Sequence, residues 1–320
     1  MNNDSLKLFI IAHTNRGPGA SAVAINLIKA LTRIGHRHVN ITALLPANCG
    51  FEKALNDYPF EPIWFDQRGS FLKRFLFDTM ILPKKIKAIK PNAILALGNI
   101  GLLKPTMPQA ILMQDAHFVY PPQYYGPMSI PQRLRYRFQK SQVKKCLKHS
   151  FMIYCQTNTM ANRIKEVFGE QKQIKVLSKN ISYSVFENAN NIHFPAEFEP
   201  FRKHFRMICL TRYNPHKNLE AIVEMFTYNY EILRNFAVFL TISSNHHPNA
   251  ARLLERIKKN GLSNNIINIG PIEQNQIPAF FKNCHAMLFP TLLESFSATY
   301  LEAMQFDLPI LTSDIDFAHE

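Results

Sequence analysis

The residues best suited to chemistry gather near the end of the chain. Glu294 and Glu302 stand eight positions apart, after an apolar stretch that is typical of a buried strand. A helix starting near Phe296 would space the two carboxylates by about 12 Å along its axis. Ser295 or Ser297 is placed to cap that helix, whose N–H groups would favour a phosphate. Carboxylates at both ends of a phosphate site suit a nucleotide sugar, although two solvated glutamates on an amphipathic helix are the plainer alternative.

A second group of residues combines two cations around a tight turn. Arg212 and Lys217 are five positions apart, where a predicted strand ends and a helix is about to begin. A guanidinium can bind an oxyanion through two parallel hydrogen bonds, and an ammonium adds a point charge. The pair could therefore stabilise the charge that develops on a departing diphosphate. Two exposed cations on a loop would show the same pattern.

Two further loops follow predicted strands in the first half of the chain. His13 to Ser21 includes Gly17 and Gly19, and glycines let the backbone approach a ligand at a helix start. This is not the dinucleotide-binding G-x-G-x-x-G pattern, and a simple turn would explain it equally well. In the other loop, His117 follows Asp115 and could bind sugar hydroxyls or polarise an acceptor. One histidine among 12 can also be purely structural.

A strongly basic stretch, from Pro131 to His149, contains no acidic residue. Leu134, Phe138 and Val143 give it a partial apolar stripe, so it could form an amphipathic helix on an anionic membrane surface. A solvated helix face is the alternative, and a nucleic-acid face is disfavoured because no recognised module accompanies it. The stretch lies in the basic half of the chain, where residues 1–190 hold 26 basic and 10 acidic residues. Its own basic residues are Arg133, Arg135, Arg137, Lys140, Lys144, Lys145 and Lys148.

These loops require strands that alternate with helices, and the hydrophobic pattern predicts such an α/β arrangement along the whole chain. The periodicity fails between Asn180 and Pro200, so we expect a linker at 186–204 between domains 1–185 and 205–320. The expected strands are Leu6 to Ala12, Val39 to Leu45, Ala93 to Leu97, Gln109 to Met113, Phe151 to Cys155, Ile174 to Leu177, Met207 to Thr211, Ala237 to Ile242, Ile266 to Ile269, Ala286 to Phe289 and Pro309 to Thr312. The main expected helices are Ala20 to Ile34, Pro131 to Lys148, Asn218 to Leu233, Asn249 to Asn260, Asn275 to Asn283 and Phe296 to Met304.

Composition narrows the class of protein. The chain has 320 residues, of which 47% are apolar and 19% charged, and this mix excludes a disordered or fibrous chain. Its five cysteines are scattered and form no C-x-x-C pair, which argues against a disulfide framework or a zinc site and favours a reducing cytosol. No apolar run approaches the length of a membrane span. We therefore expect a cytoplasmic protein, peripheral to the inner face of the membrane if the basic stretch binds lipid.

The stretch from Phe289 to Thr312 resembles the E-x(7)-E motif of family 4 glycosyltransferases, the "group 1" enzymes with a GT-B fold. The resemblance also takes in the Phe-Pro at the strand end, the Glu-Ala-Met after Leu301 and the Leu-Pro-Ile-Leu-Thr-Ser that follows. Arg212 and Lys217 match the spacing of the family's G-R-x(4)-K turn, with Thr211 where glycine is common. The sequence departs from the family at Ser295 and Ser297, and again at Phe306-Asp307.

The resemblance implies a retaining glycosyltransferase with two Rossmann-like domains facing a central cleft. Such an enzyme moves a sugar from a nucleotide-diphosphate donor to an acceptor hydroxyl. The expected pathway is the synthesis of a cell-surface glycan such as lipopolysaccharide or capsule. The resemblance implies no metal and no cofactor beyond the nucleotide-sugar co-substrate. Carried over residue by residue, the catalytic set is His117, Arg212, Lys217 and Glu294. The donor-binding set is Gly17, Gly19, Arg212, Lys217, Glu294, Ser295, Phe296, Ser297 and Glu302.

Two further expectations follow from the resemblance. Members of the family continue past the position of Glu320, so the chain is expected to be truncated at its C-terminus. The rival function is a GT-B protein that binds a nucleotide or glycan without catalysis. A sugar-nucleotide epimerase shares the fold, but the paired glutamates and the Arg/Lys turn speak against it.

Overall fold

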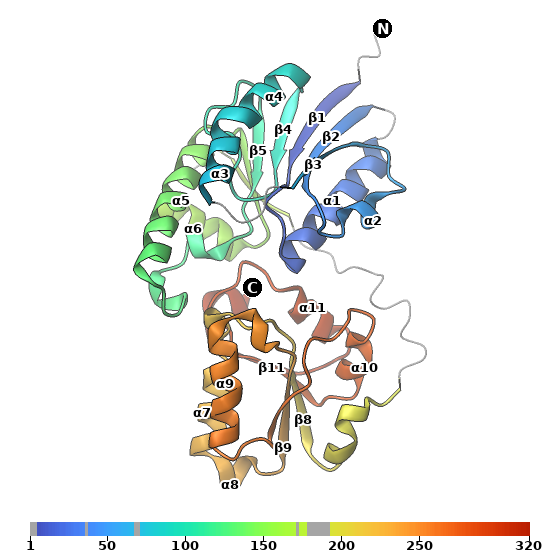
Figure 1. Ribbon diagram of the computed structural model, residues 1–320, viewed down its shortest axis with the longest axis vertical. Coiled ribbons are helices and arrows are strands. Elements are labelled where there is room, and N and C mark those ends of the chain that lie inside the picture. The colour runs from blue at the N-terminus through green and yellow to red at the C-terminus, as the bar shows by residue number, and fades with distance from the viewer. Residues whose placement is uncertain (1–4, 36–37, 67–70, 171–172, 178–192) are drawn as a thin grey trace. The chain divides into compact units, whose positions relative to one another are not determined.

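The computed structural model describes residues 5–35, 38–66, 71–170, 173–177 and 193–320 (Figure 1). The chain divides into two compact units, each built on one parallel sheet. The first unit comprises Met1–Val119 and Ser129–Ser178, and the second comprises Tyr120–Met128 and Lys179–Glu320. The second unit therefore takes a short piece of chain from within the N-terminal half.

The first unit contains a seven-stranded sheet in the order β3-β2-β1-β4-β5-β6-β7, with all neighbours parallel. Chain order reverses between β1 and β4, and at such a switch point the loops after the two strands diverge and leave room for a ligand. The strands are β1 (Leu6–Ile11), β2 (Val39–Pro46), β3 (Glu61–Phe65), β4 (Ala93–Ala96), β5 (Gln109–Leu112), β6 (Met152–Cys155) and β7 (Ile174–Val176).

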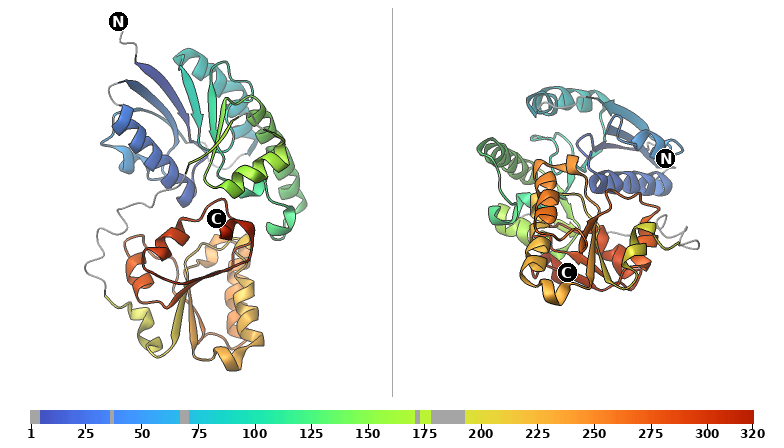
Figure 2. Two further views of the ribbon diagram at one scale, coloured as in Figure 1. Left: turned by 180° about the vertical axis from the view of Figure 1, so that it is seen from behind. Right: turned by 60° about the horizontal axis from the view of Figure 1, so that its bottom comes forward.

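Helices cover both faces of this sheet (Figures 1 and 2). On one face, α1 and α2 pack into a cluster of buried apolar side chains through residues such as Ile28 and Phe51. A capping box between Ser129 and Gln132 starts α5, and Thr157 caps α6. The helices are α1 (Pro18–Gly35), α2 (Phe51–Leu55), α3 (Phe71–Leu76), α4 (Leu82–Ile89), α5 (Ile130–Lys148) and α6 (Asn158–Phe168), with a π-helical turn η1 (Phe77–Ile81) and a 3-10 turn η2 (Ala116–Phe118).

The second unit repeats this plan with five parallel strands in the order β10-β9-β8-β11-β12, so its switch point lies between β8 and β11. The strands are β8 (Phe205–Cys209), β9 (Phe236–Leu240), β10 (Ile266–Asn268), β11 (Ala286–Phe289) and β12 (Ile310–Thr312). The helices are α7 (Glu220–Tyr228), α8 (Tyr230–Leu233), α9 (Pro248–Lys259), α10 (Ile277–Lys282) and α11 (Ala298–Met304). The 3-10 turns are η3 (Pro122–Tyr124), η5 (Ala196–Phe201), η6 (Pro215–Lys217), η7 (Ser244–His246) and η8 (Asp316–His319).

The core of the second unit lies on both faces of its sheet. Along β9, Val238 and Leu240 join one buried cluster while Ala237 and Phe239 join the other. This division follows from the two-residue period of a strand. Because both faces are buried, the strand reads as a continuous apolar run, which is typical of parallel sheets under two layers of helices.

The segment Tyr120–Met128 is anchored in the second unit by buried aromatic side chains. The Tyr120 hydroxyl donates to Asp316 Oδ1 at 2.8 Å, and the Tyr120 ring lies 6.3 Å from that of Phe317. The Tyr125 hydroxyl donates to the Tyr120 carbonyl at 2.5 Å. Gly126 adopts a φ of 75°, and a Cβ added there would lie 2.5 Å from Pro215 Cβ. The segment thus packs directly against the turn that ends at Lys217.

The α/β fold is confirmed, and the differences from expectation are local. The prediction lacked β3, an edge strand whose residues are mostly exposed and include a proline. It joined α7 and α8 into one helix, although Asn229 breaks the backbone pattern between them. Residues 186–192 of the expected linker lie outside the described residues. The described part of the expected linker, residues 193–204, includes η5, where Phe198 is fully buried in the core of the second unit. No helix in the described ranges is long and apolar enough to cross a membrane.

Candidate functional site

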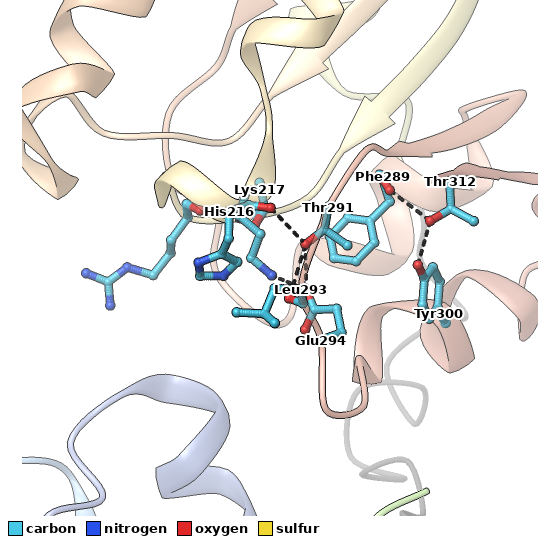
Figure 3. A network of polar contacts seen from close by, with 10 residues as sticks. His216, Lys217, Phe289, Thr291, Leu293, Glu294, Tyr300 and Thr312 are labelled. Atoms are coloured by element: carbon cyan, nitrogen blue, oxygen red, sulfur yellow. Dashed lines mark hydrogen bonds and ion pairs between the residues drawn. The ribbon is translucent and has the colours of Figure 1, made fainter. Parts of the chain in front are cut away.

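The turn after β8 and the loop after β11 meet at the switch point of the second sheet (Figure 3). The amide of Leu292 donates to the His216 carbonyl at 2.8 Å and joins the two segments. The next residue after the turn, Asn218, has a left-handed φ of 53°, which turns the chain sharply toward α7. Backbone geometry therefore holds Lys217 against the loop that follows β11.

Lys217 and Glu294, which the sequence analysis placed in one site, form an ion pair (Figure 3). Their side chains are only 15% and 13% exposed, respectively. Thr291 is fully buried, and its hydroxyl lies 3.1 Å from Glu294 Oε1. The Lys217 ammonium also lies 5.0 Å from the centre of the Phe289 ring. An ammonium and a carboxylate thus lie side by side, with both orientations fixed by neighbours, and groups of these types can bind phosphate and sugar hydroxyls.

Helix α11 differs from the prediction at its start. It begins at Ala298 rather than near Phe296, while Glu294 lies in the loop before the helix, as expected. Ser297 occupies the N-cap position, but its side chain makes no capping hydrogen bond. With seven residues, α11 has a small dipole. The Tyr300 hydroxyl lies 2.6 Å from the Thr312 hydroxyl, which is itself 2.9 Å from the Phe289 carbonyl, and these contacts tie the helix to β11 and β12.

Arg212 is exposed, and its guanidinium makes no hydrogen bond or ion pair to any residue within the described ranges. Its neighbour Tyr213 is buried and donates its hydroxyl to Glu220 Oε1 at 2.5 Å. Burial first, and then the carboxylate of Glu220, raise the pKa of Tyr213, so the phenol stays neutral. The hydrogen bond of Tyr213 therefore anchors the turn on one side of Arg212, while the guanidinium of Arg212 is available to a ligand.

In the first unit, the glycine-containing loop follows β1 and is held by its own polar residues. Asn15 is 2% exposed, and its amide donates to the carbonyls of Ala20 and Leu97 at 3.2 and 3.3 Å. The Ser21 hydroxyl donates to the Asn15 carbonyl at 2.7 Å. Gly17 precedes α1 and Gly19 lies in its first turn, and a Cβ at either would meet nothing within 4 Å. Both glycines face open space, and the loop around them is rigidly held.

His117 lies in the 3-10 turn η2 that follows β5. Its Nδ1 is 2.7 Å from Asp115 Oδ1, and its backbone N–H donates to the same carboxylate at 3.1 Å. Asn99 holds this turn, because its Oδ1 accepts from the amides of Gln114 and Asp115 at 2.6 and 2.9 Å. The carboxylate of Asp115 therefore fixes the orientation of the imidazole ring, an arrangement that is common for functional histidines.

The structure also reveals residues that the motifs did not indicate. Thr291 braces Glu294, Asn99 pins the His117 turn, and Asp78 contacts the buried His13. Asn99 and Asp78 contact residues that are distant in the sequence, whereas Thr291 is close to Glu294 along the loop. Their residue types carry no signal in the sequence. Among the described residues, no three metal-ligating side chains cluster.

The sequence of the second unit can be compared with known families. Residues 192–320 match the family model described as "Glycosyl transferases group 1". This part of the chain is therefore similar to group 1 glycosyltransferases. The match covers the Arg212 turn, the Lys217–Glu294 pair and α11, which are the features that the sequence analysis singled out.

A curated relative and several solved structures agree with this match. The "O-antigen chain mannosyltransferase RfbU" of Salmonella typhimurium is 23% identical over 234 residues. This alignment covers 72% of the chain, and the chain spans only 60% of the relative's length. Anabaena Alr3699/HepE, solved with UDP and glucose, superposes with a TM-score of 0.70 at 16% identity, covering 98% of this chain and 82% of that one. WaaG, a glycosyltransferase involved in lipopolysaccharide biosynthesis, gives 0.68 at 16% identity, covering 98% and 83%. The fold is GT-B.

Proposed function

We propose that this protein transfers a sugar from a nucleotide-diphosphate sugar to an acceptor hydroxyl with retention of anomeric configuration, in the synthesis of a cell-surface glycan such as lipopolysaccharide or capsule. The observation that carries the proposal is the Lys217–Glu294 pair at the switch point of a domain that matches group 1 glycosyltransferases. The named functions of RfbU and WaaG support the choice of glycan.

The donor would bind across the loops after β8 and β11. Arg212 and Lys217 would stabilise the diphosphate, because charge that develops on a leaving group is best met by donors already in place. Glu294 would hold a hydroxyl of the sugar, and Glu302 the ribose. The backbone from Ser295 through Ser297 would contact phosphate.

The acceptor would be served by residues of the first unit. His117, oriented by Asp115, would hold a sugar hydroxyl near the reacting carbon, and the loop with Gly17 and Gly19 would pass close to the substrates. In this scheme the acceptor oxygen forms the new bond to the anomeric carbon as the bond to the diphosphate breaks. The acceptor proton passes to the departing diphosphate, and this balances the charge without a covalent enzyme intermediate.

We further propose that the first unit rests on an anionic lipid surface. Helix α5 exposes Ile130 and Leu134 among its basic residues, and α3 exposes Leu72 and Leu76. The two helices are in contact, because the ring of Phe138 lies 5.3 Å from that of Phe75. Apolar side chains amid cations are the combination that binds an anionic interface. Sedimentation with anionic vesicles at low salt tests this, and protein left in the supernatant would contradict it.

The decisive experiment is thermal stabilisation of the whole chain by UDP, GDP and ADP and by their sugar conjugates, in the wild type, Arg212→Ala and Glu302→Ala. At about 100 times its dissociation constant, a ligand adds about 2.7 kcal/mol to stability. We expect one nucleotide family to stabilise the wild type and to lose that effect in both variants. Absence of any shift in a well-folded sample would contradict the proposal.

Turnover separates the enzyme from a protein that only binds. The same samples are assayed for release of nucleoside diphosphate from the stabilising donor, with a mixed pool of glycan acceptors and with water. Nucleotide binding without any release of diphosphate would favour the non-catalytic function. Release that disappears in Arg212→Ala would support transfer chemistry.

A further inference from the structure

The first unit contains a cavity of about 200 Å³ at its own switch point. The loops after β1, β4 and β5 form one wall, including Asn99 and Asp115. Side chains from α3, η1 and α5 form the other, including Arg74, Gln139 and Gln142. A polar cavity of this kind, at the carboxyl edge of a parallel sheet, is where ligands bind in such folds.

Arg74 is the unusual member of this wall. Its side chain is only 28% exposed, and its Nε is buried without a hydrogen-bond partner. The guanidinium makes no hydrogen bond to any other residue in the part of the chain that the structure describes, and its closest carboxylate oxygen, on Asp78, is 3.8 Å from Nε. Buried guanidinium groups normally have their N–H donors satisfied. Burial lowers the pKa of Arg74, so the site as it stands is an unfavourable place for its charge.

The two carboxylates of the cavity are each in contact with a histidine. Asp78 Oδ1 lies 2.8 Å from Nε2 of His13, which is 3% exposed. Asp115 Oδ1 lies 2.7 Å from Nδ1 of His117. Asp78 is presented by the π-helical turn η1, a form of helix that often occurs at functional sites. Asp78 Oδ2 forms only a long ion pair with Arg74, 3.8 Å from Nε, and its charge raises the pKa of Arg74 by less than burial lowers it.

A second guanidinium contacts the same aromatic ring as the first. The Arg135 guanidinium is 5.0 Å from the centre of the Phe71 ring, and that of Arg74 is 5.7 Å from the same ring. Arg135 is exposed, and within the described ranges it forms no ion pair. Its charge further lowers the pKa of Arg74. Two cations around one aromatic ring, without a carboxylate bridging them, favour a bound anion.

We propose that Arg74 and Arg135 bind a phosphate group carried by the acceptor, with the amides of Gln139 and Gln142 available to its sugar or ester oxygens. That the phosphate belongs to the acceptor rests on the proposed function, whereas the phosphate site itself does not. The phosphate could be attached to the glycan or to the lipid that carries it. The chemistry is the same in both cases, and two probes distinguish these sources.

The first probe is glucose 6-phosphate, with glucose as its uncharged counterpart, titrated calorimetrically into the whole chain in an Arg212→Ala background. That background removes the phosphate-binding turn of the second unit. We expect glucose 6-phosphate to bind more tightly than glucose, and Arg74→Gln and Arg135→Gln each to weaken it by about tenfold. Arg137→Gln is the matched control, because Arg137 is exposed on the same helix but is not one of the two guanidinium groups over the Phe71 ring. The second probe is vesicles of phosphatidylglycerol, compared with phosphatidylcholine, in the same variants.

Loss of binding in Arg74→Gln and Arg135→Gln beyond that in Arg137→Gln, with either probe, supports the site and names the source of the phosphate. Equal effects in all three variants, or absence of binding to both probes, overturn it. Nucleotide stabilisation of Arg74→Gln, with Arg212 intact, checks that this variant folds. If nucleotides fail to bind while phosphate binding depends on Arg74, the proposed function is wrong and the phosphate site stands. If nucleotides bind while phosphate binding does not depend on Arg74, the phosphate site is wrong and the proposed function stands.

Discussion

The Lys217 ammonium and the Glu294 carboxylate form an ion pair across the switch point of the second sheet, although 77 positions separate them in the chain. Both side chains are largely buried, and Thr291 hydrogen bonds to the carboxylate. The pair links the two loops that the donor would contact. Its strength therefore bears on stability as well as on binding.

Removing both members of this pair should cost less than the sum of the costs of removing each one alone. Lys217→Met or Glu294→Gln alone leaves the partner poorly solvated, and we expect a loss of about 3 kcal/mol in the free energy of unfolding. The double variant should lose less than the sum, with a coupling energy of about 1 to 3 kcal/mol. Urea denaturation of the four proteins measures the cycle. Additive losses would show that the pair contributes nothing beyond its separate members.

Arg212→Ala should lower the rate of sugar transfer with little effect on folding, because the side chain is exposed and hydrogen bonds to no described residue. Loss of a charged donor to a leaving group typically costs about 3 kcal/mol of transition-state stabilisation, which is about a hundredfold in kcat. Arg234→Ala is the matched control, since Arg234 is also exposed but precedes β9, at the opposite edge of the same sheet. Equal rates in the two variants would remove Arg212 from the mechanism.

Gly126→Ala should destabilise the second unit more than Gly261→Ala does. Both glycines have a positive φ, 75° and 69°, so both substitutions strain the backbone. Only at Gly126 would the new Cβ collide with Pro215, whereas nothing lies within 4 Å at Gly261. We expect a difference of about 1 to 3 kcal/mol in the free energy of unfolding, measured by urea denaturation. A difference near zero would mean that the segment can shift away from Pro215 without cost.

Buried thiols should make the protein less stable in alkali. Burial raises the pKa of Cys146 and of Cys209 to about 12, from 9.0 for an exposed thiol. Above pH 9.0 the unfolded chain releases these protons while the folded chain keeps them. The free energy of unfolding is therefore unaffected by these groups below pH 9.0 and falls as the pH rises toward 12.

Each thiol should contribute about 1.4 kcal/mol per pH unit to this slope at most. Urea denaturation of the wild type and Cys209→Ala across the alkaline range measures the contribution of one thiol. The variant should start from a lower stability, because it creates a small cavity, and should lose stability less steeply. Parallel slopes would contradict the assignment of the alkaline loss to Cys209.

The sequence predicted well those features that depend on local periodicity and on strand ends. Buried strands such as β11, whose four residues are all buried, matched their expected ranges because parallel strands under two layers of helices are apolar throughout. The expected meeting of Lys217 and Glu294 followed from the rule that strand ends gather at one edge of the sheet. The edge strand β3 escaped prediction because Glu61 and Pro62 face solvent and break the apolar pattern.

Features that depend on the folded environment of a residue could not be predicted. Nothing in the residue types of Arg74 or Asp78 shows that α3 and the π-helical turn after it place them at a cavity, with Asp78 beside His13. The start of α11 at Ala298 was missed because Phe296 and Ser297 read equally well as the first residues of the helix. The role of His117 stays a prediction, and so do the roles of the donor-binding residues, of which the Arg212 and Glu302 variants test two.

The route of the chain through its two units also constrains the order in which the protein can form during synthesis. Tyr120 leaves the ribosome 196 residues before Asp316, the carboxylate that receives its hydroxyl hydrogen bond. At about 5 to 20 residues per second, its partner is absent for about 10 to 40 s. During that time the aromatic segment that starts at Tyr120 has no core in which to pack, while the strands of the first unit are already complete up to β7 once Val176 has emerged. The nascent chain therefore exposes an aromatic loop with three tyrosines, Tyr120, Tyr124 and Tyr125. A chaperone could bind this loop and prevent aggregation until the residues around Asp316 have been synthesised.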